Sequence, residues 1–120
     1  AAALLIQRRQ PTDAIKLTLS LFAQNPRSRV AAMNHAAALL LNHRPSEAEA
    51  LLRSVPANRL TRTQAAVYNF NLFEACFHLG DFDRAWPILD RIDLSHLYPA
   101  QRRWLEQARE RLAINESMNQ

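Results

Sequence analysis

Apolar side chains recur every three or four residues along most of the chain, and short polar or proline-containing stretches interrupt them. This spacing places apolar residues on one face of a helix, so it predicts helices rather than strands. The interruptions contain the residues that typically break helices, such as Asn25-Pro26 and Gly80-Asp81. The pattern therefore predicts seven helices, at about residues 1–10, 12–24, 28–42, 46–54, 61–79, 82–92 and 99–114.

Two of these segments have patterns that predict their surroundings. The 61–79 segment has two apolar stripes, which consist of Ala65, Leu72, Cys76 and Leu79 and of Ala66, Phe70, Phe73 and Phe77. A helix that is apolar on two sides is packed between neighbours. The 99–114 segment has one narrow stripe, made of Trp104, Leu105, Ala108 and Leu112. It is expected to be a terminal helix that docks by one face and meets water with the other.

Several helix starts have residues that can cap free backbone amides. Ser46 with Glu49, and Thr61 with Gln64, have the spacing of capping boxes. We therefore expect these four side chains to fix the starts of the fourth and fifth helices.

The helix after Gly80 has a less regular start. Asp81 or Asp83 is expected to cap it, since either carboxylate suits the positive end of a helix. Pro87 lies only a turn or so further on and lacks an amide hydrogen, so a kink or an irregular first turn is expected there.

Composition supports an all-α fold. The 120 residues include one glycine and one cysteine, and alanine and leucine, both strong helix formers, are abundant. A single glycine excludes the glycine-rich loops that cradle phosphates, and it disfavours hairpin-rich folds. Cys76 alone cannot form an internal disulfide or a thiolate zinc site.

The formal net charge of +4 comes almost entirely from arginine, with Lys16 as the lone lysine. The arginines are scattered among acids, which favours a solvated surface over a nucleic-acid patch. No apolar run is long enough to span a bilayer and no secretory signal is present, so a soluble, cytoplasmic protein without membrane insertion is expected. The start, without methionine and inside a helical pattern, suggests a piece of a longer protein.

An internal repeat is the strongest feature of the sequence. Ala14, Ala48 and Ala85 each lie near the start of a short helix and are 34 and 37 residues apart. The register extends to further pairs of apolar residues, namely Leu39 with Cys76, Leu52 with Leu89, and Val55 with Ile92. Repeats of this length are typical of helical arrays.

The unit resembles the tetratricopeptide repeat. The best match is Tyr68 through Ile92, where Leu79-Gly80-Asp81-Phe82-Asp83-Arg84-Ala85 resembles the turn between the paired helices. In that pattern the glycine ends the first helix and the alanine allows close approach of the second. The second unit departs from the family by having His43-Arg44-Pro45 where glycine is usual, and Phe73 stands where a small residue is preferred.

The resemblance implies a right-handed α-solenoid of antiparallel helix pairs in a single domain. Residues 1–26 would be a partial first repeat, 28–56 the second, 61–97 the third and 99–115 a capping helix.

The resemblance also implies a protein–protein interaction module, such as an adaptor, scaffold or chaperone, that holds a partner peptide or helix in an apolar concave groove. By register with the family the groove is lined by Val30, Met33, Asn34, Ala37, Leu40, Leu41, Val67, Phe70, Asn71, Glu74, Phe77 and His78. Met33 and Phe70 are expected to be its most exposed members. With Phe77 they would supply apolar contact, while Glu74, His78 and Asn34 would set polarity and register.

Alternatives remain open. A secretion-system chaperone or a self-association domain would use the same architecture, and an RNA-binding helical repeat is less favoured because no aromatic is interleaved with the arginine pairs. Asn34 and Asn71 fall where a carboxylate-binding subtype has asparagine, but Val67 replaces the expected cation. The histidines have no helical pairing that suggests a metal site, and the sequence predicts no catalytic residue and no cofactor.

Overall fold

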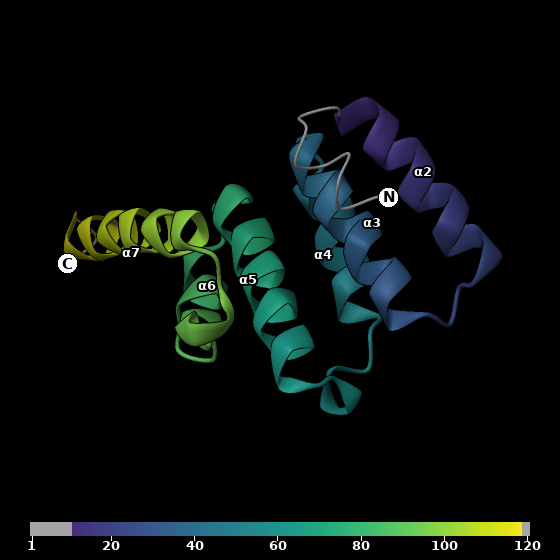
Figure 1. Ribbon diagram of the computed structural model, residues 1–120. Coiled ribbons are helices and arrows are strands. Elements are labelled where there is room, and N and C mark those ends of the chain that lie inside the picture. The colour runs from purple at the N-terminus through teal and green to yellow at the C-terminus, as the bar shows by residue number, and fades with distance from the viewer. Residues whose placement is uncertain (1–10, 119–120) are drawn as a thin grey trace.

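A computed structural model describes residues 11–118 and is all-helical over that range, without a strand (Figure 1). It contains six α-helices and two short 3₁₀ helices: α2 (Pro11–Gln24), α3 (Arg29–Leu41), α4 (Pro45–Arg53), η1 (Ala57–Arg59), α5 (Arg62–His78), α6 (Phe82–Leu89), η2 (Leu94–His96) and α7 (Pro99–Met118). The all-α prediction and six of the seven predicted helices are therefore confirmed. The predicted helix at 1–10 lies outside the described residues.

Helix caps explain where α3, α4 and α5 begin. Thr61 and Gln64 form the predicted capping box, each side chain accepting a backbone amide of the other at 3.1 Å. The capping box predicted at Ser46 is wrong, because α4 begins one residue earlier at Pro45. Proline suits a first helical position, where its missing amide hydrogen leaves no donor to cap. The sequence reasoning also missed Ser28, which caps α3 by accepting from the Ala31 amide at 3.1 Å.

The start of α6 follows the prediction only in part. Asp81 occupies the N-cap position, but its side chain makes no capping bond and pairs instead with Arg84 at 3.3 Å. Asp83 lies in the first turn, where its charge suits the helix dipole. Pro87 lies inside α6, which still continues to Leu89 and ends three residues before the predicted boundary.

The α3–α4 and α5–α6 turns have the same backbone structure. His43 has φ +58° and Gly80 has φ +75°, both in the left-handed region. In each turn the amide of this residue bonds a carbonyl three residues back, Leu40 or Phe77, at 3.0 to 3.1 Å. The following amide reaches five residues back, at 2.9 to 3.0 Å. This is the Schellman ending of a helix, so His43 adopts in its turn the conformation that glycine provides more easily.

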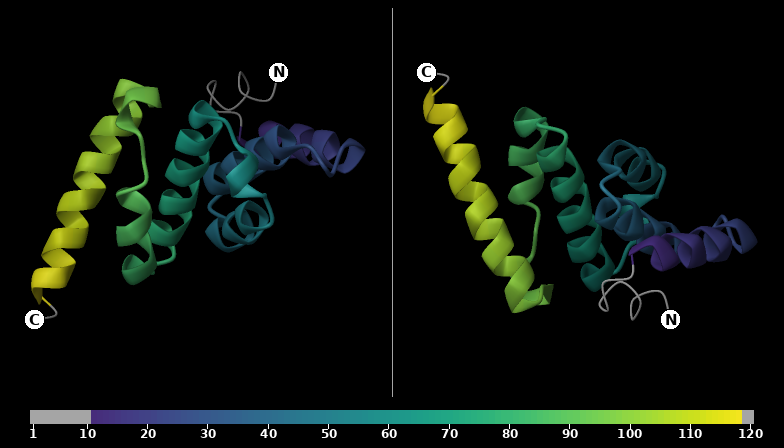
Figure 2. Two further views of the ribbon diagram at one scale, coloured as in Figure 1. Left: turned by 90° about the horizontal axis from the view of Figure 1, so that it is seen from below. Right: turned by 90° about the horizontal axis from the view of Figure 1, so that it is seen from above.

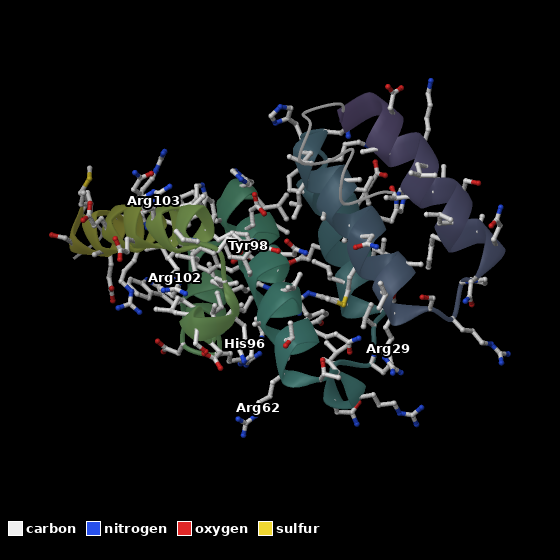
Figure 3. The ribbon with its side chains drawn as sticks, viewed as in Figure 1. Arg29, Arg62, His96, Tyr98, Arg102 and Arg103 are labelled. Atoms are coloured by element: carbon white, nitrogen blue, oxygen red, sulfur yellow. The ribbon has the colours of Figure 1, made fainter. Side chains whose placement is uncertain are left out.

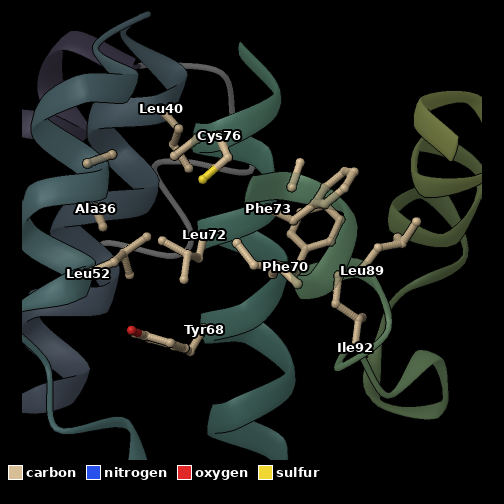
Figure 4. Packing of buried hydrophobic residues seen from close by; sticks show 14 of the residues in the cluster. Ala36, Leu40, Leu52, Tyr68, Phe70, Leu72, Phe73, Cys76, Leu89 and Ile92 are labelled. Carbon is tan, nitrogen blue, oxygen red and sulfur yellow. The ribbon is translucent and has the colours of Figure 1, made fainter. Parts of the chain in front are cut away.

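Successive helices from α2 to α6 pack side by side, and α3 also contacts α5. Figure 4 shows α5 in the middle, with Leu72 and Cys76 turned toward α3 and α4, and Phe70 and Phe73 turned toward Leu89. The two apolar stripes predicted for this helix therefore face two different neighbours. The repeated alanines Ala14, Ala48 and Ala85 are fully buried, as close helix approach requires.

The last helix, α7, docks through one face, as its sequence predicts. Leu105, Ala108 and Leu112 are buried, while the arginines between them are exposed. In Figure 2 α7 lies at the end of the molecule, beside α6. Within residues 11–118 no helix combines the length and apolar character needed to cross a bilayer.

Candidate functional site

The residues predicted to line one groove have three different environments. The first group is buried. Met33 and Phe70, expected to be the most exposed members, have only 6% and 7% of their surface accessible, and Asn71 is buried too. The expectation of exposure is wrong for Met33 and Phe70, because Met33 belongs to the central apolar cluster and Phe70 lies beneath a tryptophan from α7.

The second group is the aromatic face that α7 covers. The Trp104 ring makes edge contacts with Phe70 at 5.6 Å, Phe73 at 5.9 Å and Phe77 at 5.5 Å between ring centroids. Arg111 of the same helix lies over the Phe77 ring at 6.0 Å. The chain's own C-terminal helix thus occupies the aromatic surface that was predicted to contact a partner. The stripe containing Trp104 was visible in the sequence, but not the face it would meet.

The third group remains accessible, but at two separate places. Val30 and Asn34 of α3 face the end of α2, where they line a hollow of about 320 Å³ with Thr18, Leu21, Gln24, Asn25, Ser28 and Ala31. Ala37 and Val67 are half-buried. Leu41, Glu74 and His78 line a second hollow, at the other end of α3.

A hollow of about 430 Å³ joins the ends of α3 and α5 and the start of α4. We call it the α3–α5 hollow; its lining residues are Leu40, Leu41, His43, Pro45, Glu74 and His78. Four of them, Leu40, Leu41, Glu74 and His78, were predicted to line the groove. His43 and Pro45 were missed because the sequence reasoning treated this turn only as a departure from the repeat. In this turn His43, which has positive φ, contributes its side chain to the lining of the hollow.

The Glu74 carboxyl is the polar group of greatest interest in the α3–α5 hollow. Its side chain is 26% exposed, and burial raises the pKa of this carboxyl to about 7. His78 Nε2 lies 3.8 Å from Glu74 Oε2. Burial, together with the nearby His43, lowers the pKa of His78, so this imidazole is a weak cationic partner. The carboxyl therefore changes charge near neutral pH.

Cys76 is buried, as predicted, but it has a partner that the sequence did not reveal. Its thiol donates to Glu49 Oε2 at 3.2 Å. Arg53 and Arg84 both reach the same oxygen at 3.3 Å. Burial and the Glu49 carboxylate raise the pKa of the thiol to about 11. Glu49 thus links α4, α5 and α6, and the thiol is held in its unreactive, protonated form.

A polar link also joins α2 to α3. Thr18 and His35 are both buried, and the hydroxyl and Nδ1 lie 2.9 Å apart. Thr18 also donates to the Ile15 carbonyl at 3.2 Å. Burial is the main reason for the lowered pKa of His35, so the neutral imidazole fits a structural bond between the two helices. Among residues 11–118 no group of histidine, cysteine and carboxylate side chains is arranged to hold a metal ion.

Basic side chains lie near the starts of three helices, Arg29 in α3, Arg62 in α5 and Arg102 and Arg103 in α7, and the three places are well separated in Figure 3. None of these three helices has an acidic residue in its first turn. Tyr98, directly before α7, is 70% exposed. This exposed ring directly precedes, along the chain, the helix that contains Arg102 and Arg103.

Comparisons of the chain with protein-family models, with curated proteins and with solved structures find no significant match.

Proposed function

We propose that the protein is a protein–protein interaction module built as a short α-solenoid of tetratricopeptide-like helix pairs. Three observations support this proposal. The turns at His43 and Gly80 share one backbone structure, the alanines at the repeat period are fully buried, and α3 contacts α5 as first helices of successive units do. The module has no catalytic step, and its role is that of an adaptor, scaffold or chaperone.

The α3–α5 hollow is the proposed docking site for an apolar segment of a partner protein. The observation that carries this proposal is the accessible Leu41 beside a hollow large enough for a side chain. Leu41 is 42% exposed, and Leu40 and Pro45 add apolar surface next to it. Burial of such surface drives association, while Glu74 and the two imidazoles fix the orientation of the bound segment.

Selection from a random peptide library displayed on phage tests the proposal, with the immobilised protein as bait. Peptides selected on the protein should lose binding to the Leu41→Asp variant, because a carboxylate would be placed in the apolar part of the hollow. Leu19→Asp is the matched control. Leu19 is 54% exposed, lies on α2 and does not line the hollow. Equal binding to both variants, or no selected peptide, would contradict the proposal.

Self-association is the main alternative within this class, with a second copy of the chain as the partner. It predicts that the mass measured by sedimentation rises with protein concentration and that Leu41→Asp suppresses the rise. A mass that stays at the monomer value while selected peptides bind favours a foreign segment.

Binding of single-stranded RNA is a second candidate function, favoured by the exposed Tyr98, which directly precedes the helix that contains Arg102 and Arg103. Bases stack on such rings while arginines neutralise phosphates. A fluorescent oligouridylate is a suitable probe. RNA binding predicts a steep loss of affinity with added salt and a further loss in Tyr98→Ala. Undetectable binding at low salt would remove this candidate.

A further inference from the structure

We propose, on the basis of the proposed function, that the α3–α5 hollow receives a basic side chain of the partner segment, in particular an arginine. Its aliphatic stem would lie against Leu40 and Leu41, and its charged head beside the Glu74 carboxyl. The inference deepens the proposed docking site by naming the chemistry of its occupant.

The position of Glu74 is the first argument. Its carboxyl lies in a hollow that Leu40, Leu41 and Pro45 line together with two imidazoles, and the lining contains no lysine or arginine. The nearest ion-pair partner given by the structure is His78, at 3.8 Å and on the same helix. A partly buried carboxylate costs free energy unless a cation and hydrogen-bond donors satisfy it. An incoming cation would supply both.

The shape and composition of the hollow are the second argument. Leu40 and Leu41 at the end of α3 and Pro45 at the start of α4 provide apolar walls around one acidic group. Arginine and lysine combine an apolar stem with a charged head, so their side chains match such a surface. Guanidinium is favoured over ammonium because it is more weakly hydrated and can donate two parallel bonds to one carboxylate.

The remaining titratable groups of the hollow must tolerate the cation. They are His78 on α5 and His43 in the α3–α4 turn. The pKa of His78 is lowered, so near neutral pH this ring is uncharged and can accept a bond from the guanidinium. Below that range a protonated His78 would repel the cation, and Glu74 itself would be protonated. Both effects act in the same direction, so affinity should rise with pH.

An NMR titration of the isotope-labelled protein tests the inference with two small probes. One probe is N-acetyl-arginine N-methylamide, and the other is the citrulline analogue, which has nearly the same shape without the charge. At pH 8 the arginine probe should shift the signals of Leu40, Leu41 and His78 and bind about tenfold more tightly than the citrulline probe. The dissociation constant should rise about tenfold between pH 8 and pH 6.

The Glu74→Gln variant shows whether the preference for the arginine probe comes from the carboxylate or from the two histidines. This variant should bind both probes equally, whereas Glu110→Gln, an exposed site on α7, should keep the preference for arginine. Equal binding of both probes to the unchanged protein, or no binding of either at millimolar concentration, would overturn the inference. Failure of the arginine pocket can be told apart from failure of the proposed function. Library peptides whose binding depends on Leu41 but which contain no basic residue would refute only the arginine pocket.

Discussion

Trp104 of α7 lies edge-on against Phe77 of α5, with ring centroids 5.5 Å apart and planes inclined by 76°. This geometry is favourable for aromatic pairs, and it adds to the area that both rings bury. The contact joins the last helix to the central one across the surface that repeat register assigned to a partner. It therefore moves the candidate docking site from the aromatic residues to the α3–α5 hollow.

Replacing Trp104 by alanine should lower the free energy of unfolding by about 3 kcal/mol, because the ring contacts Phe70, Phe73 and Phe77. Urea unfolding followed by circular dichroism measures the change. Tyr98→Ala is the control, since that ring is largely exposed and should cost about 0.5 kcal/mol or less. Equal stability of both variants would show that α7 does not depend on this contact.

Because the two turns have the same backbone structure, substitutions at their positive-φ residues should change the free energy of unfolding in opposite directions. His43→Gly should raise the free energy of unfolding by about 0.5–1 kcal/mol, because glycine adopts positive φ without strain. Gly80→Ala should lower it by about 1 kcal/mol, even though an added Cβ would meet no atom within 4 Å. Thermal unfolding midpoints check both changes. A shift of the same sign in both variants would contradict the shared turn structure.

The raised pKa of Glu74 makes stability depend on pH. The folded-state pKa of about 7 exceeds the ordinary value of 4.5, so the folded protein binds the proton more tightly than the unfolded chain. The stabilisation is present below about pH 4.5 and is lost as pH rises through 7.

Glu74→Gln should remove this dependence of stability on pH. Between pH 4.5 and pH 8 the free energy of unfolding of this variant, relative to that of the unchanged protein, should rise by up to about 3 kcal/mol. Urea unfolding at a series of pH values measures the difference between the two proteins. His35 and His78, whose lowered pKa values act in the opposite direction, are present in both and cancel. A difference in the free energy of unfolding that stays constant over this pH range would contradict the raised folded-state pKa of the Glu74 carboxyl.

Glu49 should matter more for stability than its exposed neighbour Glu47. Glu49→Gln weakens the link to Arg53, Arg84 and Cys76 and should cost about 1–2 kcal/mol. Glu47→Gln removes only an exposed pair with Arg44 and should cost about 0.5 kcal/mol or less. Urea unfolding of the two variants makes the comparison. Similar costs would argue against Glu49 as a link between helices.

Local sequence signals predicted the helices well because helix formation here follows apolar spacing and residues such as Pro26, Thr61 and Gly80. These local signals failed for features that depend on contacts between residues far apart in the sequence. Nothing near Phe70 in the sequence shows that Trp104, more than thirty residues later, will cover it. Likewise the spacing of Ser46 and Glu49 fits a capping box, but Pro45 starts the helix and Arg84 engages the glutamate.

The α3–α5 hollow was predictable only in part. Repeat register selected Leu40, Leu41, Glu74 and His78 because each was assigned to an inner position of a first helix. His43 and Pro45 belong to a turn in which histidine, and not glycine, has positive φ. Local sequence patterns therefore did not predict this turn or the presence of His43 in the lining of the hollow. Burial of Glu74 by leucines from α3 is likewise a tertiary effect.

Chemical-shift mapping of a library-selected peptide on the isotope-labelled protein locates the docking site residue by residue. The largest shifts should fall on Leu41, Glu74 and His78, and Leu41→Asp should abolish them while Leu19→Asp should not. Shifts confined instead to Tyr98 and the arginines at the start of α7, or to the α2–α3 hollow around Val30, would contradict docking in the α3–α5 hollow.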